Sequence, residues 1–182
     1  MHYALAHRWR SIIAALASIA LMLGLVTAVA PSANAETMNK REYLQALVAH
    51  EKLSYDVFTR LALLHPRGPF RLMARAEQRD LERMRRLLRA NEWRDLTVGD
   101  RRGQFRHFPL VEQTYFDMIA NGQNSIGDGA RVGVALQQMS LGMIFELLDL
   151  RLNRRDRTQL NYSRAYSTNR MVTLWTTIAR QS

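Results

Sequence analysis

Three carboxylic acids occupy positions where the helical spacing of the sequence calls for apolar side chains. Glu51 lies three and seven residues after Val48 and Leu44, and Glu77 and Asp80 interrupt the apolar stripe of the next segment. A lone buried carboxylate is costly, so it is normally paired, protonated or bound to a metal. One carboxylate on a helix and two at i and i+3 on its neighbour are typical of a dinuclear metal site inside a bundle. The commoner role, an ion pair with an arginine at the edge of the stripe, stays open.

The segments that must position these acids are helical by pattern. Apolar residues recur with helical spacing, and no stretch of comparable length alternates with period two, so no sheet is expected. Asn39 followed by Glu42 predicts a capping box at the start of the first helix. The predicted long helices cover about 39–65, 70–90, 129–152 and 156–179, and region 95–127 contains a short helix opened by Pro109. We therefore expect an all-α four-helix bundle with a crossover region.

The first 35 residues predict export. Arg8 and Arg10 precede an uncharged run of apolar and small residues, 11–30, and Ala33-Asn34-Ala35 presents small residues where a signal peptidase reads them. An uncleaved N-terminal membrane anchor is the alternative, because about twenty apolar residues can just span a bilayer. We expect residues 1–35 to be a secretory signal peptide and residues 36–182 to form one periplasmic or secreted domain.

Composition narrows the chemistry further. The sequence has no cysteine, which excludes disulfides, thiolate catalysis and cysteine-held metal sites. The formal net charge is +10, carried mostly by arginine, and such a surface attracts anions. If this charge serves binding, the favoured partner is an anionic envelope polymer or a membrane surface, and nucleic acid is not expected. The simpler interpretation of the arginines is a solvated helical face. The sequence leaves open whether the protein forms a homo-oligomer. The predicted anion-binding surface consists of Arg71, Arg75, Arg79, Arg83, Arg86, Arg101, Arg102 and Arg106.

Five segments together resemble a bacterial family of ferritin-like domains whose function is undefined. The first contains Glu-Lys-Leu followed by Asp-Val and an aromatic residue, the second Glu-Gln-Arg and the third Gly-x-Phe. The fourth leads into the third long helix, and the fifth has Ser-Thr-Asn-Arg where the family has Ser-Arg-Asn-His. These segments are residues 49–58, 74–80, 103–105, 122–138 and 167–170. The resemblance covers nearly all of residues 36–182 and implies a ferritin-like four-helix bundle.

The resemblance also implies where metal ligands would stand. Metal-binding ferritin-like proteins hold iron or manganese with a Glu on the first helix, Glu-x-x-His on the second, Glu on the third and a His motif on the fourth. Glu51 and Glu77 match that pattern. Two histidines and two glutamates of the pattern are replaced here, by Asp80, Arg170, Gln137 and Gln138. A Gln carbonyl is a poor ligand for a divalent metal pair, and a guanidinium has no free lone pair.

We therefore expect a degenerate metal site, without cofactor or catalysis. The expected buried polar network joins the acids to Gln137, Gln138 and Arg170. In the alternative the protein binds iron or manganese, as a storage protein or an oxidase, through Glu51, Glu77 and Asp80, completed by Glu146 or His50. The sequence has no zinc-peptidase motif, phosphate-binding loop or nucleophile elbow, so it favours a structural or binding role over an enzyme.

Overall fold

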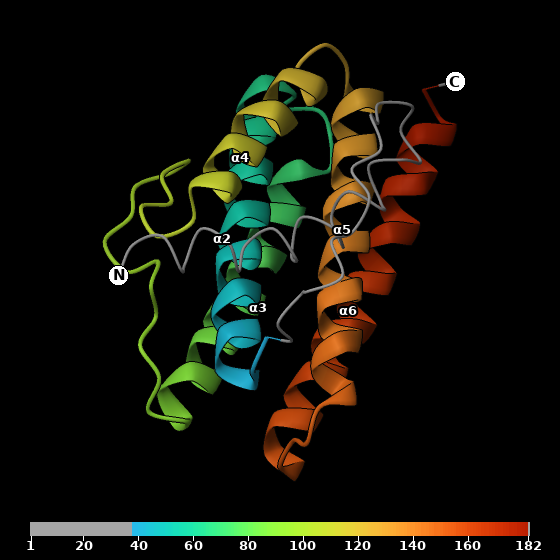
Figure 1. Cartoon of the computed structure of the whole chain (residues 1–182). Coiled ribbons are helices and arrows are strands. Elements are labelled where there is room, and N and C mark those ends of the chain that lie inside the picture. Colours follow the sequence, from blue (N-terminus) through green and yellow to red (C-terminus); the bar gives the residue numbers. More distant parts are fainter. Residues whose placement is uncertain (1–37, 182) are drawn as a thin grey trace, which may run out of the picture.

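The computed structural model describes residues 38–181 (Figure 1). The helices follow one another as α2 (Lys40–Leu64), α3 (Phe70–Ala90), α4 (Pro109–Gly122), α5 (Ile126–Asp149) and α6 (Arg154–Ala179). Residues 38–181 contain no strand, which confirms the all-α class. The predicted signal peptide and the alternative membrane anchor lie outside the described residues. Within the described part of the chain, no helix combines the length and apolarity that a membrane crossing requires.

Polar side chains cap the N-termini of α2, α5 and α6. The Asn39 side chain accepts a hydrogen bond from the Glu42 backbone N–H, and the Glu42 carboxylate accepts one from the Asn39 backbone N–H, each at 3.1 Å, as the capping box predicted. Helices α5 and α6 begin a few residues before the predicted positions 129 and 156. The reason is that Ser125 and Asn153 each accept a hydrogen bond from the backbone N–H three residues later.

The four long helices α2, α3, α5 and α6 lie side by side, as Figure 1 shows. Helix α2 packs mainly on α3, α5 packs mainly on α6, and the two pairs meet chiefly through α2 and α5. Helices α3 and α5 run in the same direction, so the chain between them returns along the molecule through residues 91–125. That return contains α4, which packs against α2 and α5 at the end where α5 begins.

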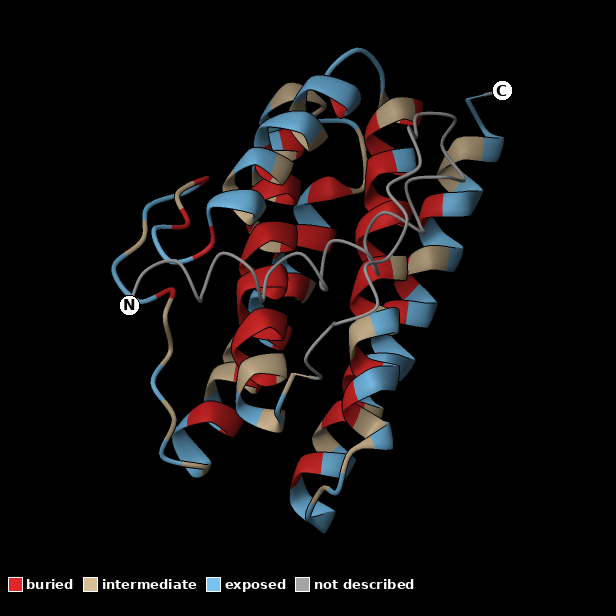
Figure 2. Cartoon of the chain, viewed as in Figure 1, coloured by how far each residue is buried: buried red, intermediate tan, exposed pale blue. Residues whose placement is uncertain are grey.

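Two apolar clusters fill the space between the long helices, and each takes side chains from all four of them. The first cluster includes Phe58, Phe70, Leu136 and Leu174. The second includes Leu47, Met84, Ile144 and Leu160. Burying each such side chain contributes about 1.5–3 kcal/mol. Along every long helix, buried polar residues lie between the residues of the two clusters, and Figure 2 shows the buried side of each helix turned inward.

Candidate functional site

Polar residues from all four long helices meet between the two apolar clusters. We call this group the central polar cluster; its charged and amide members, all buried, are Glu51 of α2, Glu77 and Asp80 of α3, Gln137 of α5 and Arg170 of α6. The i, i+3 spacing of Glu77 and Asp80 turns both carboxylates of α3 toward α6. Five of the six residues proposed from the sequence as a pocket are therefore neighbours in space.

Arg170 bridges the acids of α3 and the amide of α5. Its Nε lies 3.0 Å from Glu77 Oε1 and donates to Gln137 Oε1 at 2.9 Å. Its Nη2 donates to Asp80 Oδ2 at 2.7 Å and to Ser167 Oγ at 3.0 Å. The Gln137 amide in turn donates to Glu77 Oε1 at 2.9 Å. Burial alone would lower the pKa of Arg170, but attraction to Glu77 and Asp80 raises it, so the guanidinium stays charged in the core.

Glu51 has no cation of its own in this cluster. Its Oε1 accepts a hydrogen bond from Ser140 Oγ at 2.6 Å. Burial raises the pKa of Glu51 well above its usual range, and the negative charges of Glu77 and Asp80 raise it further. Burial also raises the pKa of Glu77, while Arg170 and a hydrogen bond with Glu51 lower it. Within the described residues, the buried Oε2 atom of Glu51 has no hydrogen-bond partner. The raised pKa favours the neutral, protonated form of this acid.

Arg83 supplies a second cation to the cluster. Its Nη1 forms an ion pair with Asp80 Oδ1 and donates to Ser163 Oγ at 3.2 Å. Only 17% of its side chain is exposed. Arg83 was predicted to belong to the outer anion-binding surface, but that prediction is wrong for this residue, because its ion pair with the buried Asp80 turns the side chain inward. The cluster thus contains two guanidinium groups and three carboxyl groups. With Glu51 protonated, the two positive charges equal the two remaining negative charges.

Gln138 and Glu146 lie outside the cluster. Gln138 is half-buried and, within residues 38–181, makes no hydrogen bond to the other candidates. Since neighbouring helical residues point about 100° apart, Gln137 and Gln138 cannot both face the centre of the bundle. Glu146 is exposed and lies near Tyr43, whose pKa is raised first by burial and then by that charge.

His50 is buried but is not free to bind a metal through Nε2. That nitrogen lies 3.0 Å from the Leu136 carbonyl oxygen, and because a carbonyl can only accept, the nitrogen carries the proton. Burial lowers the pKa of His50 to about 4, so the ring is neutral.

A dinuclear metal does not fit these residues. Oxygens of Glu77 and Asp80 are taken by Arg170, whose positive charge lies where a metal would have to bind. Among residues 38–181, no group of three or more His, Asp or Glu side chains has an arrangement able to hold a metal ion. The cluster is built as a hydrogen-bonded ionic network, and no step of metal chemistry follows from it.

A second buried ionic group, which was not predicted from the sequence, lies beside the first. Lys52 Nζ donates to Asp56 Oδ2 at 2.6 Å, to the Arg101 carbonyl at 2.9 Å and to the Gln104 carbonyl at 3.3 Å. It also lies 4.2 Å from the centre of the Phe105 ring. We call Lys52 and Asp56, with the loop backbone that they hold, the loop anchor. The sequence feature that could have indicated this pair is the i, i+4 spacing of Lys52 and Asp56 within residues 49–58.

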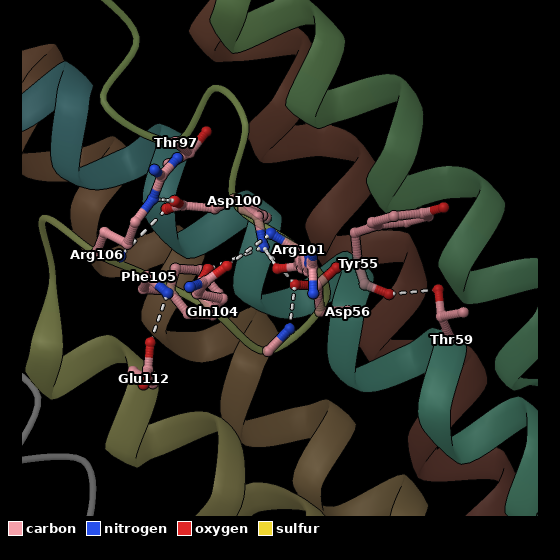
Figure 3. A network of polar contacts seen from close by, with 12 residues as sticks. Tyr55, Asp56, Thr59, Thr97, Asp100, Arg101, Gln104, Phe105, Arg106 and Glu112 are labelled. Carbon is pink, nitrogen blue, oxygen red and sulfur yellow. Dashed lines mark hydrogen bonds and ion pairs between the residues drawn. The ribbon is translucent and has the colours of Figure 1, made fainter.

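The other half of the loop anchor involves Asp56 and α4. Asp56 Oδ2 accepts the backbone N–H of Gly103 at 2.9 Å, and Glu112 Oε2 accepts that of Phe105 at 2.7 Å. Figure 3 shows Asp56 facing the loop and Glu112 reaching it from α4. Gly103 has a φ of 71°, and a Cβ there would lie 2.5 Å from the Tyr115 ring, so only glycine fits.

The remaining predicted arginines form two separate groups. Arg71, Arg75, Arg79 and Arg86 are exposed along α3. Arg101, Arg102 and Arg106 are exposed on the loop before α4 and line an open cavity there.

Comparison with known proteins agrees with this helical architecture. Residues 40–167 match the family described as an uncharacterized protein domain, DUF2202. No curated protein matches the chain. The crystal structure of hypothetical protein MJ0754 from Methanococcus jannaschii DSM 2661 is similar with a TM-score of 0.75 and 20% identity, over 85% of this chain and 87% of that one. That likeness extends to the fold alone. Because the family match covers more than half of the sequence, the chain belongs to the DUF2202 family.

Proposed function

We propose that this protein is an exported ferritin-like four-helix bundle whose metal site has been replaced by an ion-pair network, and that it acts by binding or support without catalysis. The observation that carries the proposal is the position of Arg170. Its guanidinium lies 3.0 Å from Glu77 and 2.7 Å from Asp80. In the metal-binding ferritin-like pattern that this sequence resembles, a histidine ligand stands at that position. Here the arginine supplies a fixed positive charge in place of the charge of a bound metal ion.

Two further features support the ferritin-like part of the proposal. Bundles of this type have one long crossover between their helix pairs, and residues 91–125 make such a connection between α3 and α5. Glu51 and Glu77 come from adjacent helices, and the charge of Glu77 raises the pKa of Glu51, as expected for two carboxyl groups that face one another. The export part rests only on the sequence of residues 1–35.

Metal content is the direct test. The full chain is expressed, offered iron, manganese, zinc and copper separately, and compared with the Glu51→Ala/Glu77→Ala variant by elemental analysis. We expect no stoichiometric metal in either protein, and equal trace binding in both would also agree with the proposal. About one or two metals per chain, lost in the variant, would overturn it.

The intact mass of the same sample reports whether residues 1–35 are removed, and an uncut chain would contradict export by a cleaved signal.

A restored variant tests the ferritin-like part separately. Asp80→His, Gln137→Glu and Arg170→His together rebuild the expected ligand types. A helical variant that gains manganese or iron supports the proposed ancestry of the site. If circular dichroism shows a folded variant and no metal binds, the four helices do not hold these positions in ferritin-like geometry.

A further inference from the structure

Residues of the loop between α3 and α4 line an open surface cavity of about 580 Å³. Its lining includes Arg101, Arg102 and Arg106 from the loop and Glu112 and Phe116 from α4. The cavity shares no lining residue with the central polar cluster, and the proposed function does not use it.

The charges around this cavity are not balanced. Within residues 38–181, neither Arg101 nor Arg102 has a carboxylate partner within ion-pair distance, and both are exposed. Arg106 pairs with Asp100 at 2.5 Å, and Glu112 is engaged by the Phe105 backbone N–H. Two guanidinium groups adjacent in the chain are therefore available to an anion.

The backbone that carries these arginines is held by groups buried below it. Lys52 binds the carbonyl oxygens of Arg101 and Gln104, and Asp56 binds the intervening Gly103 N–H. Both charged side chains of this pair are about 95% buried. A backbone held in this way lowers the ordering cost of binding a ligand.

We propose that this cavity binds a phosphate-type oxyanion between Arg101 and Arg102. Guanidinium groups match the oxygens of a tetrahedral anion with paired hydrogen bonds. The anion is either free or the head of a larger molecule, and Phe116, which is 56% exposed, offers an apolar contact to whatever is attached. This proposal does not depend on the metal state of the central polar cluster.

The test is calorimetric titration of the full chain with inorganic phosphate and pyrophosphate at low ionic strength, and vesicle sedimentation with and without phosphatidylglycerol. The variant is Arg101→Gln/Arg102→Gln, and the matched control is Arg71→Gln/Arg75→Gln, which removes the same charge from exposed positions on α3. We expect the dissociation constant to rise about tenfold or more in the loop variant, the effect of losing charge-assisted hydrogen bonds. The control should stay within about twofold, as remote charges are screened.

Each outcome decides the proposal. Loss of phosphate binding in the loop variant alone supports a site for the free anion, and loss of vesicle binding alone supports a lipid headgroup. Equal weakening in variant and control means general charge attraction and overturns the site. Absence of binding to phosphate, pyrophosphate and vesicles by the unaltered chain overturns it as well. Circular dichroism of both variants confirms that each is folded.

Discussion

Glu51 and Lys52 are neighbours in the sequence of α2, and each belongs to a different buried ionic group. In the central polar cluster, two guanidinium groups face three carboxyl groups, and the excess is absorbed by a proton on Glu51. In the loop anchor, one ammonium faces one carboxylate, and the remaining hydrogen-bonding capacity is taken by loop backbone. The first group joins helices to one another, and the second joins a helix to a loop.

The difference shows two ways of making a buried charge tolerable. The central polar cluster depends on its protonation state, so its stability must vary with pH. In the loop anchor the charges of Lys52 and Asp56 balance each other, and the backbone groups that complete their hydrogen bonding do not titrate. Removing Arg170 should therefore cost more than removing Lys52, because Arg170 is paired with two acids and Lys52 is paired with one.

Replacing Arg170 with Met should have the largest effect. The variant leaves Glu77 without its cation and Asp80 with only Arg83, and breaking a buried pair of this kind costs about 3–5 kcal/mol. Urea unfolding followed by circular dichroism measures the loss. The control is Arg157→Met, an exposed position on the same helix, which should change stability by less than about 0.5 kcal/mol. Unchanged stability of the Arg170 variant would refute the ion-pair network.

Replacing Lys52 with Met should cost about 2–4 kcal/mol, because one buried carboxylate is left unpaired while it still accepts the Gly103 N–H. The loop should also loosen, so the backbone amide of Gly103 should exchange its hydrogen faster. Adding Asp56→Asn, which removes the orphaned charge and keeps the acceptor oxygen, should recover part of the stability. Slow exchange at Gly103 in the single variant would show that the loop is held by other contacts.

Replacing Glu51 with Gln should have the smallest effect and the opposite sign. The amide is neutral and has nearly the same shape as the protonated acid, and its oxygen can still accept the hydrogen bond from Ser140. The unfolded chain loses the Glu51 proton near its ordinary pKa of about 4.3, while the folded chain keeps it, so the wild type pays an increasing cost as pH rises from there. The variant should be about 1–3 kcal/mol more stable near pH 7.

Unfolding curves between about pH 4 and pH 7 measure that difference. The gap between Glu51→Gln and the wild type should close toward the acid end, where both folded and unfolded wild type hold the proton. A gap that is independent of pH, or a variant that is less stable at neutral pH, would show that Glu51 is ionised in the folded protein.

The sequence was most informative where a residue type conflicted with its position. Helical spacing alone placed Glu51, Glu77 and Asp80 on buried stripes, and the structure finds all three buried. Arg170 was selected only through the resemblance, since a single arginine on a polar helix carries no such conflict. The all-helical class and the capping box followed from local pattern, and the helix starts shifted where Ser125 and Asn153 act as caps.

The rest depended on contacts between distant segments. The i, i+4 spacing of Lys52 and Asp56 is typical of an ion pair on the surface of a helix. Both side chains are buried only because the loop packs over them. Arg83 belongs by spacing to the outer arginine row of α3, yet a flexible four-bond side chain reaches the nearest buried acid. Periodicity fixes the direction of a Cβ atom, and it does not fix where a long side chain ends.

The division of the apolar core by the central polar cluster also sets the register of the helices. If one long helix slid along its neighbours by a turn, an acid or Arg170 would enter an apolar cluster and lose its partners. Leucine-rich contacts tolerate such a slip, because one aliphatic side chain replaces another. A buried polar layer does not, and in coiled coils a single buried Asn fixes alignment in the same way at a cost in stability. The cluster thus makes one alignment of the four helices much more favourable than any other.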